Sequence, residues 1–383
     1  MQYVPYEALG KDVSRLGFGC MRLPTVKQDE QNVIDRPRAI QMIRHGIDSG
    51  VTYVDTAYGY HREESEVVVG LALKEGYRDK VTLTTKLPPW LVKERSDMDK
   101  LLDTQLRRLD VPYLDFYILH AQNKDTYERL SALGYKEFYD SALKDGRIKH
   151  TGFSFHDDKD TFFKILHDYD FELAQVQFNY LDVFDQATID GVREAGRIGT
   201  GVVVMEPLRG GSLANPPKEI REMIEKEGRG WSPVEWAMRF VANFPEVKVI
   251  LSGMSNEAQV DDNLRIFSQP DFVPGMLSDA DIAFTDTLRT EYKKRIPIGC
   301  TGCEYCQPCP QGVKIPGIFR DYNEAVMLGN MDDFAWGYAS TIKKEADASK
   351  CVQCLACENI CPQHIEITKW LQTIDKKYQE IKK

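Results

Sequence analysis

The chain has 383 residues, of which 42% are hydrophobic and 28% are charged, and it is long enough for a large barrel with an appended domain. Its formal net charge of -10 argues against a nucleic-acid partner, because binding to phosphates requires a basic surface. The N-terminus lacks the apolar segment of a signal peptide, and no uncharged run approaches the ~20 residues that span a bilayer. We therefore expect a soluble cytoplasmic protein without a membrane partner.

Up to about residue 275, short apolar runs rich in β-branched residues alternate with longer amphipathic stretches. The runs expected to form strands are 15–19, 51–55, 81–86, 114–120, 150–154, 173–178, 201–205 and 247–252. The stretches expected to form helices are 38–49, 63–74, 99–109, 126–144, 161–168, 186–197 and 233–243. Strict alternation predicts a parallel sheet, and eight such units predict an α/β fold of the (β/α)8 TIM-barrel type. A doubly wound sheet would normally show a G-x-G-x-x-G turn after its first strand, and the sequence has none.

Ionisable side chains lie where three consecutive predicted strands end. Asp55 and Tyr60 follow the second strand, Lys86 ends the third, and His120 ends the fourth. The carboxyl ends of barrel strands meet at one rim, so these four side chains should share a site. A single residue of any of these types at a strand end usually has only a structural role. The interpretation as a catalytic site depends on all four occurring together.

The four side chains have a clear chemical use as a group. A free tyrosine has a pKa near ~10, and a nearby ammonium lowers it. With Asp55 holding Lys86 in place, Tyr60 could donate a proton to a carbonyl oxygen. His120 would orient that carbonyl and stabilise the developing alkoxide.

The segments 55–60, 64–66, 85–87 and 114–120, with Gly70, resemble the signature of the aldo-keto reductase superfamily. The likeness extends from about residue 3 to 290. It maps the family's catalytic tetrad onto Asp55, Tyr60, Lys86 and His120. The resemblance implies an NAD(P)H-dependent oxidoreductase that reduces a small-molecule carbonyl substrate, an aldehyde or ketone, or oxidises the alcohol.

The resemblance also implies a set of residues that bind the nicotinamide cofactor. They are Met21, Arg22, Ser154, Gln177, Met205, Pro207, Leu208, Gly210, Gly253, Ser255, Gln259 and Asn263. Phe155 departs from the family pattern, which has Asn after the serine. Some relatives grip the 2′-phosphate of NADP with a Lys and an Arg where Gly253 and Gln259 stand here. The absence of these two cations weakens a preference for NADP without establishing NAD. Because Gln is common at the second position among relatives, we still expect NADP, with NAD as the alternative.

Eight of the nine cysteines lie in the last quarter of the chain, in two runs, each followed by a proline. The first run is Cys300, Cys303, Cys306 and Cys309, and the second is Cys351, Cys354, Cys357 and Cys361. Such spacing is typical of iron–sulfur ligation, although the first run is one residue short before its last cysteine. Zinc would prefer two separated pairs of ligands, and disulfides require a secreted chain. The remaining cysteine, Cys20, is expected to be a small buried residue.

We expect two 4Fe–4S clusters, with a single cluster or zinc as the alternatives. Each cluster would take three thiolates from one run and the fourth from the other. The first set would be Cys300, Cys303, Cys306 and Cys361. The second set would be Cys351, Cys354, Cys357 and Cys309.

Two domains follow from these patterns. Residues 1–295 are expected to form the aldo-keto reductase barrel, with a polar helix at 279–295. Residues 296–383 are expected to form a small, mainly α-helical, ferredoxin-like 4Fe–4S domain, as in the iron–sulfur branch of the superfamily. Helical patterns occur there at 316–328, 331–344 and 365–383.

Two functions from different classes remain open at this point. The first is the oxidoreductase, and the second is an electron-transfer protein whose barrel is a docking scaffold with little turnover. A nicotinamide moves two electrons as hydride, whereas a 4Fe–4S cluster moves one. The sequence shows no flavin signature. Either an external flavoprotein or other redox partner mediates, or the clusters are structural.

Overall fold

The computed structural model describes residues 1–29 and 31–382, and these form two compact units. The barrel unit contains Met1–Gly210 and Val234–Ile282. The C-terminal unit contains Gly211–Pro233 and the residues from Ala283 onward. The predicted division of the chain after residue 295 stays a prediction. Among the described residues, no helix combines the length and apolarity needed to cross a bilayer.

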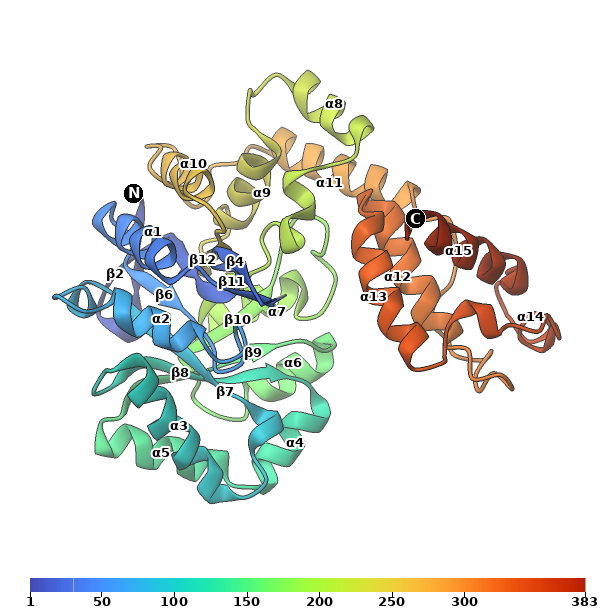
Figure 1. Ribbon diagram of the computed structural model, residues 1–383. Coiled ribbons are helices and arrows are strands. Elements are labelled where there is room, and N and C mark those ends of the chain that lie inside the picture. Colours follow the sequence, from blue (N-terminus) through green and yellow to red (C-terminus); the bar gives the residue numbers. More distant parts are fainter. Residues whose placement is uncertain (30, 383) are drawn as a thin grey trace. The chain divides into compact units, whose positions relative to one another are not determined.

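The barrel unit is built on a closed barrel of parallel strands in the order β10-β11-β12-β3-β6-β7-β8-β9 (Figure 1). These strands are β3 (Leu16–Gly19), β6 (Tyr53–Asp55), β7 (Thr82–Leu87), β8 (Leu114–Gln122), β9 (Ile148–Phe155), β10 (Leu173–Gln177), β11 (Gly201–Met205) and β12 (Val247–Gly253). Each of the eight predicted runs overlaps one of them. The predicted TIM barrel is therefore confirmed.

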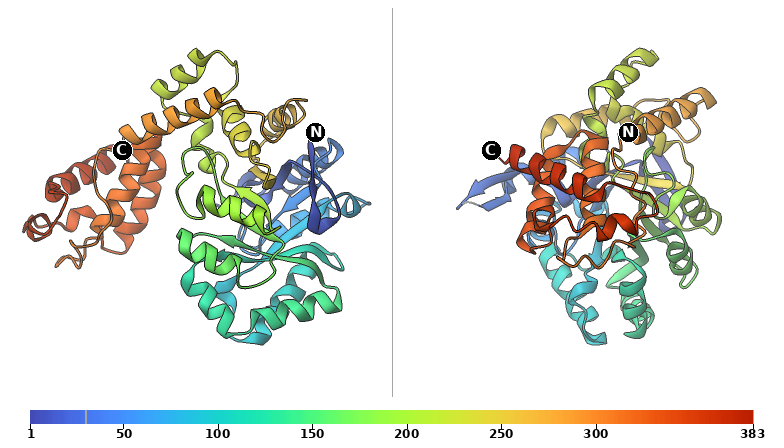
Figure 2. Two further views of the ribbon diagram at one scale, coloured as in Figure 1. Left: turned by 180° about the vertical axis from the view of Figure 1, so that it is seen from behind. Right: turned by 90° about the vertical axis from the view of Figure 1, so that its right-hand side faces the viewer.

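Helices alternate with the strands and surround them (Figures 1 and 2). They are α1 (Arg36–Asp48), α2 (Ser65–Ala72), α3 (Arg95–Leu109), α4 (Lys124–Ala132), α5 (Tyr135–Asp145), α6 (Lys159–Leu166), α7 (Thr188–Arg197), α9 (Pro233–Ala242) and α10 (Glu257–Phe267). The single helix predicted over 126–144 is in fact two, α4 and α5. Gly134, between them, has a φ of 77°, a left-handed conformation that interrupts the helical path.

An N-terminal hairpin, which the sequence analysis did not predict, packs at the amino-terminal end of the barrel strands. It consists of β1 (Tyr3–Tyr6) and β2 (Lys11–Ser14), which pair antiparallel. Tyr6 is buried among the barrel-lining side chains. Its ring packs against Gly201 so closely that a Cβ added there would lie 2.5 Å from it. Burying a side chain of this size stabilises the fold by about 1.5–3 kcal/mol. The opposite, carboxyl-terminal rim is thus the end available for a site. A second hairpin, β4 (Thr25–Gln28) with β5 (Gln31–Ile34), follows β3.

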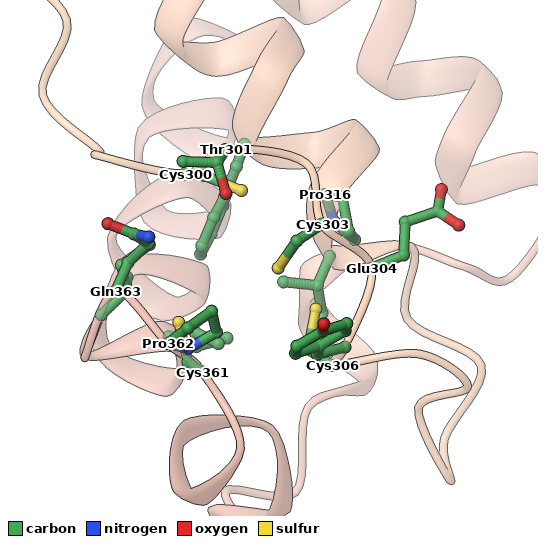
Figure 3. Close-up of a pocket in the computed structure, with 14 residues that line it drawn as sticks. Cys300, Thr301, Cys303, Glu304, Cys306, Pro316, Cys361, Pro362 and Gln363 are labelled. Atoms are coloured by element: carbon green, nitrogen blue, oxygen red, sulfur yellow. The ribbon is translucent and has the colours of Figure 1, made fainter.

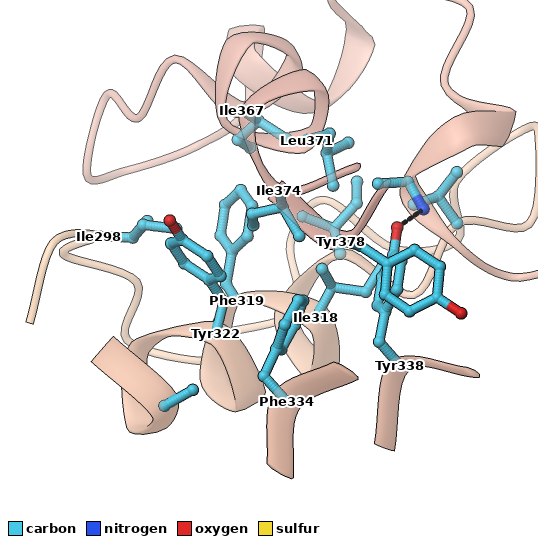
Figure 4. Packing of buried hydrophobic residues seen from close by; sticks show 14 residues of the cluster. Ile298, Ile318, Phe319, Tyr322, Phe334, Tyr338, Ile367, Leu371, Ile374 and Tyr378 are labelled. Atoms are coloured by element: carbon cyan, nitrogen blue, oxygen red, sulfur yellow. Dashed lines mark hydrogen bonds between the residues drawn. The ribbon is translucent and has the colours of Figure 1, made fainter. Parts of the chain in front are cut away.

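The C-terminal unit is mainly helical, as predicted. It contains α8 (Lys218–Glu227), α12 (Ile315–Leu328), α13 (Met331–Lys343), α14 (Ala356–Asn359) and α15 (Ile367–Ile381), while α11 (Asp279–Lys294) starts in the barrel unit. Helices α12 and α13 lie side by side (Figures 1 and 2). Their apolar faces and that of α15 enclose a small core that includes Phe319, Phe334 and Leu371 (Figure 4). Within it the hydroxyl of Tyr338 accepts a hydrogen bond from Ala348 N at 2.8 Å. Six of the eight clustered cysteines pack against this core.

Candidate functional site

The strand ends bring the four predicted catalytic residues to the carboxyl-terminal rim of the barrel. Asp55 is the last residue of β6, Tyr60 lies in the turn after it, and Lys86 lies near the end of β7. His120 lies where β8 shifts its register against β9, between Leu119 and Gln122. Such irregularities commonly re-aim a side chain next to a site.

Lys86 is the centre of this group. Its Nζ donates to Asp55 Oδ1 at 2.7 Å, to Thr56 O at 2.8 Å and to the Tyr60 hydroxyl at 3.4 Å. The side chains of Lys86 and Asp55 are only 1% and 3% exposed. The rings of Tyr60 and His120 meet edge to face, with centroids 6.0 Å apart. The structure therefore places all four residues together.

The charge state of Lys86 follows from its surroundings. Burial by itself lowers the pKa of Lys86, but Asp55 and Tyr60 more than offset this, and the pKa is raised. Burial raises the pKa of Asp55, against the lowering effect of Lys86. We regard the pair as ionised, because an ammonium 2.7 Å away favours the carboxylate. A fixed positive charge therefore lies beside the Tyr60 hydroxyl.

The pKa of Tyr60 differs from the expectation that Lys86 would lower it. Lys86 does lower the pKa of Tyr60, but burial raises it by more, so the net direction is upward. In this state Tyr60 keeps its proton. Burial, assisted by the charge of Lys86 and by His156, lowers the pKa of His120 to about 3. His120 is thus neutral near neutral pH, and within the described residues its buried Nδ1 has no hydrogen-bond partner.

Five of the predicted cofactor residues form one contact group around Arg22. Its side chain lies across Gly253, where an added Cβ would come within 3.3 Å of it, and its guanidinium is equally close to Gly210. Ser255 Oγ donates to Arg22 O at 2.8 Å, and Ser255 N donates to Gln259 Oε1 at 2.7 Å. The two glycines thus leave the space that Arg22 occupies.

The other predicted cofactor residues lie at neighbouring strand ends. Ser154 Oγ on β9 accepts from Ala121 N at 2.7 Å. Gln177 and Met205 are register partners at the ends of β10 and β11. The amide of Gln177 donates to Asp182 at 2.8 Å and accepts from Gln186 at 2.9 Å.

Four further predicted cofactor residues have different settings. Asn263 on α10 is buried and donates to Ser252 Oγ at 2.9 Å. Pro207 is buried and Leu208 half-buried after β11, while Met21 is 58% exposed. The predicted cofactor residues therefore follow a continuous arc of the rim from β9 to β3, and the four catalytic candidates lie on β6 to β8.

Two side chains at the rim, Trp90 and Asp182, were not among the predicted site residues. The ring of Trp90 lies 5.3 Å from that of His120 and is 53% exposed, so it borders the catalytic candidates. Asp182 is buried and holds the amides of Gln177 and Asn179 as well as Arg209. A tryptophan four residues after Lys86 was visible in the sequence, but nothing local indicated that its ring reaches His120.

Four of the eight clustered cysteines line a single cavity in the C-terminal unit. Cys300, Cys303 and Cys306 line one part of it, and Cys361 from the second run lines another (Figure 3). Their sulfur atoms face a common space in that view. Within residues 1–29 and 31–382, no three His, Cys, Asp or Glu side chains are close enough to hold a single metal ion. A cubane cluster is larger than one ion, and four thiols around a cavity fit its ligand set.

The second predicted set, Cys351, Cys354, Cys357 and Cys309, does not line this cavity. Burial raises the pKa of Cys357 to about 11, and the neighbouring Glu358, Cys351 and Cys306 add to this effect. The two runs are therefore close to each other in this unit. Cys303 and Cys354 are exposed. Cys20, in the barrel unit, is fully buried as predicted.

Comparison with known proteins bears on both units. The Aldo/keto reductase family model matches residues 15–282, and the 4Fe-4S dicluster domain model matches residues 299–366. These matches confirm the resemblance inferred from the motifs. The "Probable aldo-keto reductase 1" of Glycine max is 25% identical over 391 residues, which cover 91% of this chain and 98% of that protein.

Solved structures share the barrel. The holo form of aldo-keto reductase AKR11C1 from Bacillus halodurans has a TM-score of 0.63 and 22% identity, covering 75% of this chain and 96% of that one. An aldo/keto reductase from Klebsiella pneumoniae in complex with NADP and acetate has a TM-score of 0.58 and 23% identity, covering 74% and 93%. At this level of identity the likeness concerns the fold.

Proposed function

Because this chain belongs to the aldo/keto reductase family, we propose that it is an NAD(P)H-dependent oxidoreductase that reduces the carbonyl of an aldehyde or ketone, or oxidises the alcohol. One observation carries this proposal. A buried, charged Lys86 lies 2.7 Å from Asp55 and 3.4 Å from the hydroxyl of Tyr60, whose ring meets a neutral His120. This arrangement suits proton donation to a carbonyl oxygen.

Each residue of the proposed tetrad has a distinct task. Tyr60 holds its proton until the carbonyl oxygen gains negative charge, and it then donates that proton. Lys86 lowers the cost of the charge left on the phenol oxygen, and Asp55 keeps Lys86 in place. Neutral His120 donates a hydrogen bond that orients the carbonyl and stabilises its developing charge.

The arc from β9 to β3 would hold the nicotinamide dinucleotide, which supplies the hydride when bound. Ser154, at the end of β9 beside β8, lies next to the catalytic candidates along the rim, and Gln177 and Met205 follow on β10 and β11, so we assign these three to the nicotinamide end. Arg22 is an exposed cation against Gly210 and Gly253, which suits the phosphate end. We propose NADP as the cofactor, with NAD as the alternative.

We propose that the C-terminal unit holds two 4Fe–4S clusters, which supply one-electron transfer when bound. Cys300, Cys303, Cys306 and Cys361 would hold the first, and the cavity that they line supports this set. Cys351, Cys354, Cys357 and Cys309 would hold the second.

The surroundings of the cysteines favour an external redox partner. The segments 299–313 and 351–365 contain few charged side chains. Besides the cysteines, their ionisable residues are Glu304 and Tyr305 in the first segment and Glu358 and His364 in the second. Four of their large side chains are exposed: Tyr305 63%, Val352 62%, Leu355 47% and Ile360 55%. A flavoprotein or another electron carrier could dock on such a surface through apolar contacts. This observation also keeps the second candidate function, electron transfer with a scaffold barrel, in consideration.

One experiment separates the two functions. The protein is purified without air and titrated with NADPH and with NADH, while cofactor fluorescence and the visible absorbance of the clusters are followed. Steady turnover of an aldehyde with either cofactor supports the oxidoreductase. Cofactor binding without turnover of any aldehyde, ketone or alcohol, together with reducible clusters, would favour the electron-transfer protein.

A further inference from the structure

The turn after Tyr60 has an unusual backbone. His61, Arg62 and Glu63 have φ angles of 50°, 56° and 74°, in the left-handed region that residues other than glycine rarely adopt. Three such residues in succession persist only where the surrounding structure fixes them. The backbone of Tyr60 belongs to the same turn, since Tyr60 O accepts hydrogen bonds from Glu63 N and Ser65 N.

The ring of His61 reaches out of this turn to another segment of the barrel unit. Its Nε2 accepts a hydrogen bond from Leu23 N at 3.1 Å. The side chain is partly buried, and burial lowers the pKa of His61, while an interaction with the Met21 backbone opposes this. Only a neutral imidazole can accept at Nε2, so the lowered pKa is consistent with the observed contact.

The segment from Cys20 to Leu23 is held at three points. Cys20 O accepts from Ser65 Oγ at 3.0 Å, and Arg22 O accepts from Ser255 Oγ at 2.8 Å. The third point is the bond from Leu23 to His61. Between these anchors Arg22 lies against Gly210 and Gly253. The position of its guanidinium therefore depends on how the segment is held.

We propose that His61 is a positioning residue that ties the Arg22 segment to the Tyr60 turn. Through its backbone it belongs to the turn that presents the proton donor, and through its ring it fixes the segment that presents a cation to the cofactor's phosphates. One side chain thus sets the placement of cofactor and proton donor relative to each other. This inference rests on the proposed function.

A matched pair of variants tests it. In His61→Gln the amide can place an acceptor near the position of Nε2, whereas in His61→Asn it ends near Nδ1 and cannot reach Leu23 N. Asparagine tolerates a left-handed φ, so the turn itself is retained. We expect His61→Asn to raise the Kd for NADPH and to lower kcat for an accepted aldehyde, by about 10- to 100-fold in kcat/KM. His61→Gln should stay within a few-fold of the wild type.

The route through Arg22 is tested by a double-mutant cycle on Kd. If His61 acts by placing Arg22, His61→Asn should add little to the loss caused by Arg22→Gln. A bond that only satisfies Leu23 N would instead give additive effects, and so would overturn the inference. Thermal unfolding and iron content of each variant report whether it is folded.

The outcomes also separate this inference from the proposed function. A wild-type Kd and kcat in folded His61→Asn would overturn the inference alone, because the enzyme itself would still work. A wild-type chain that binds neither NADPH nor NADH would overturn the proposed function, and the inference with it. If His61→Asn does not fold, equal losses of kcat/KM in His61→Gln and Arg22→Gln would also count against the inference.

Discussion

At the scale of single residues, burial and charge act in opposite directions on the same groups. Lys86 is buried yet keeps its proton, because Asp55 and Tyr60 offset the cost of burial. Tyr60 keeps its proton although a cation lies 3.4 Å away, because its own burial outweighs that charge. A phenol that stays protonated until a substrate oxygen becomes basic suits a proton donor better than one that is already ionised.

The first prediction concerns Tyr60. We expect Tyr60→Phe to lower kcat for carbonyl reduction by about 10²- to 10⁴-fold, because it removes the proton donor and keeps the ring. The Kd for NADPH, measured by fluorescence titration, should change little, since the predicted cofactor residues lie on other strands. Turnover close to that of the wild type would show that a different acid donates the proton.

A second prediction concerns the pH dependence of His120. Its pKa is lowered to about 3, so its neutral form predominates at every pH above that value. Lowering the pH from about 8 to about 5 crosses the ordinary histidine range without protonating it. We expect His120→Asn to reduce kcat while leaving the shape of the kcat profile in this range unchanged. Loss of an acid limb in the variant would mean that His120 titrates in that range.

At the scale of elements, a buried polar network fixes β7 against two helices. Gln105 on α3 donates to Glu66 on α2 at 2.6 Å and to the backbone oxygen of Lys86 at 3.0 Å. It also accepts from the hydroxyl of Tyr117 on β8 at 2.7 Å. The backbone that carries Lys86 is therefore held from outside the barrel, away from the site.

The third prediction tests this network. Gln105→Met fills a similar volume but removes the hydrogen bonds that Gln105 makes with Glu66, the Lys86 carbonyl and the Tyr117 hydroxyl. We expect the free energy of unfolding to fall by about 1–3 kcal/mol, because a buried group loses its hydrogen bonds. Denaturant unfolding measures the change. Arg107→Gln on the exposed face of α3 is the control, with an expected change within about 0.5 kcal/mol. Equal stability of both variants would contradict the role given to Gln105.

At the scale of the whole molecule, one chain combines a barrel of the aldo/keto reductase family with a 4Fe-4S dicluster domain. The barrel unit belongs to the aldo/keto reductase family, and we propose that it transfers hydride; the C-terminal unit matches a 4Fe-4S dicluster domain, and such clusters move single electrons. The core of the C-terminal unit is small and packs against six of its cysteines. Metal binding and folding should therefore be coupled in that unit.

The fourth prediction follows from the shared cavity. Cys361 belongs to the second run but lines the cavity with three cysteines of the first. Wild-type protein prepared without air should contain about eight irons per chain. Cys361→Ala should lose its first cluster and loosen the unit, so that iron falls below half and limited proteolysis of residues 296–383 becomes faster. Cys20→Ser, in the barrel unit, should keep the wild-type iron count.

Two results would contradict that prediction. A wild-type count near four irons, on the basis of four irons per cluster, would mean that only one cluster is held. Zinc in place of iron after anaerobic expression would remove the redox role of the unit.

The sequence by itself determined the alternation of strands and helices, the strand ends that carry Asp55 and Lys86, and the two cysteine runs. These features follow from local periodicity and spacing, which a linear pattern records directly. Only the tertiary structure decided that Arg22 lies against Gly253 and that the ring of Trp90 lies beside His120. It also decided that burial outweighs Lys86 in setting the pKa of Tyr60. Contacts between distant residues and the loss of water around a side chain depend on closure of the fold, and no local pattern encodes them.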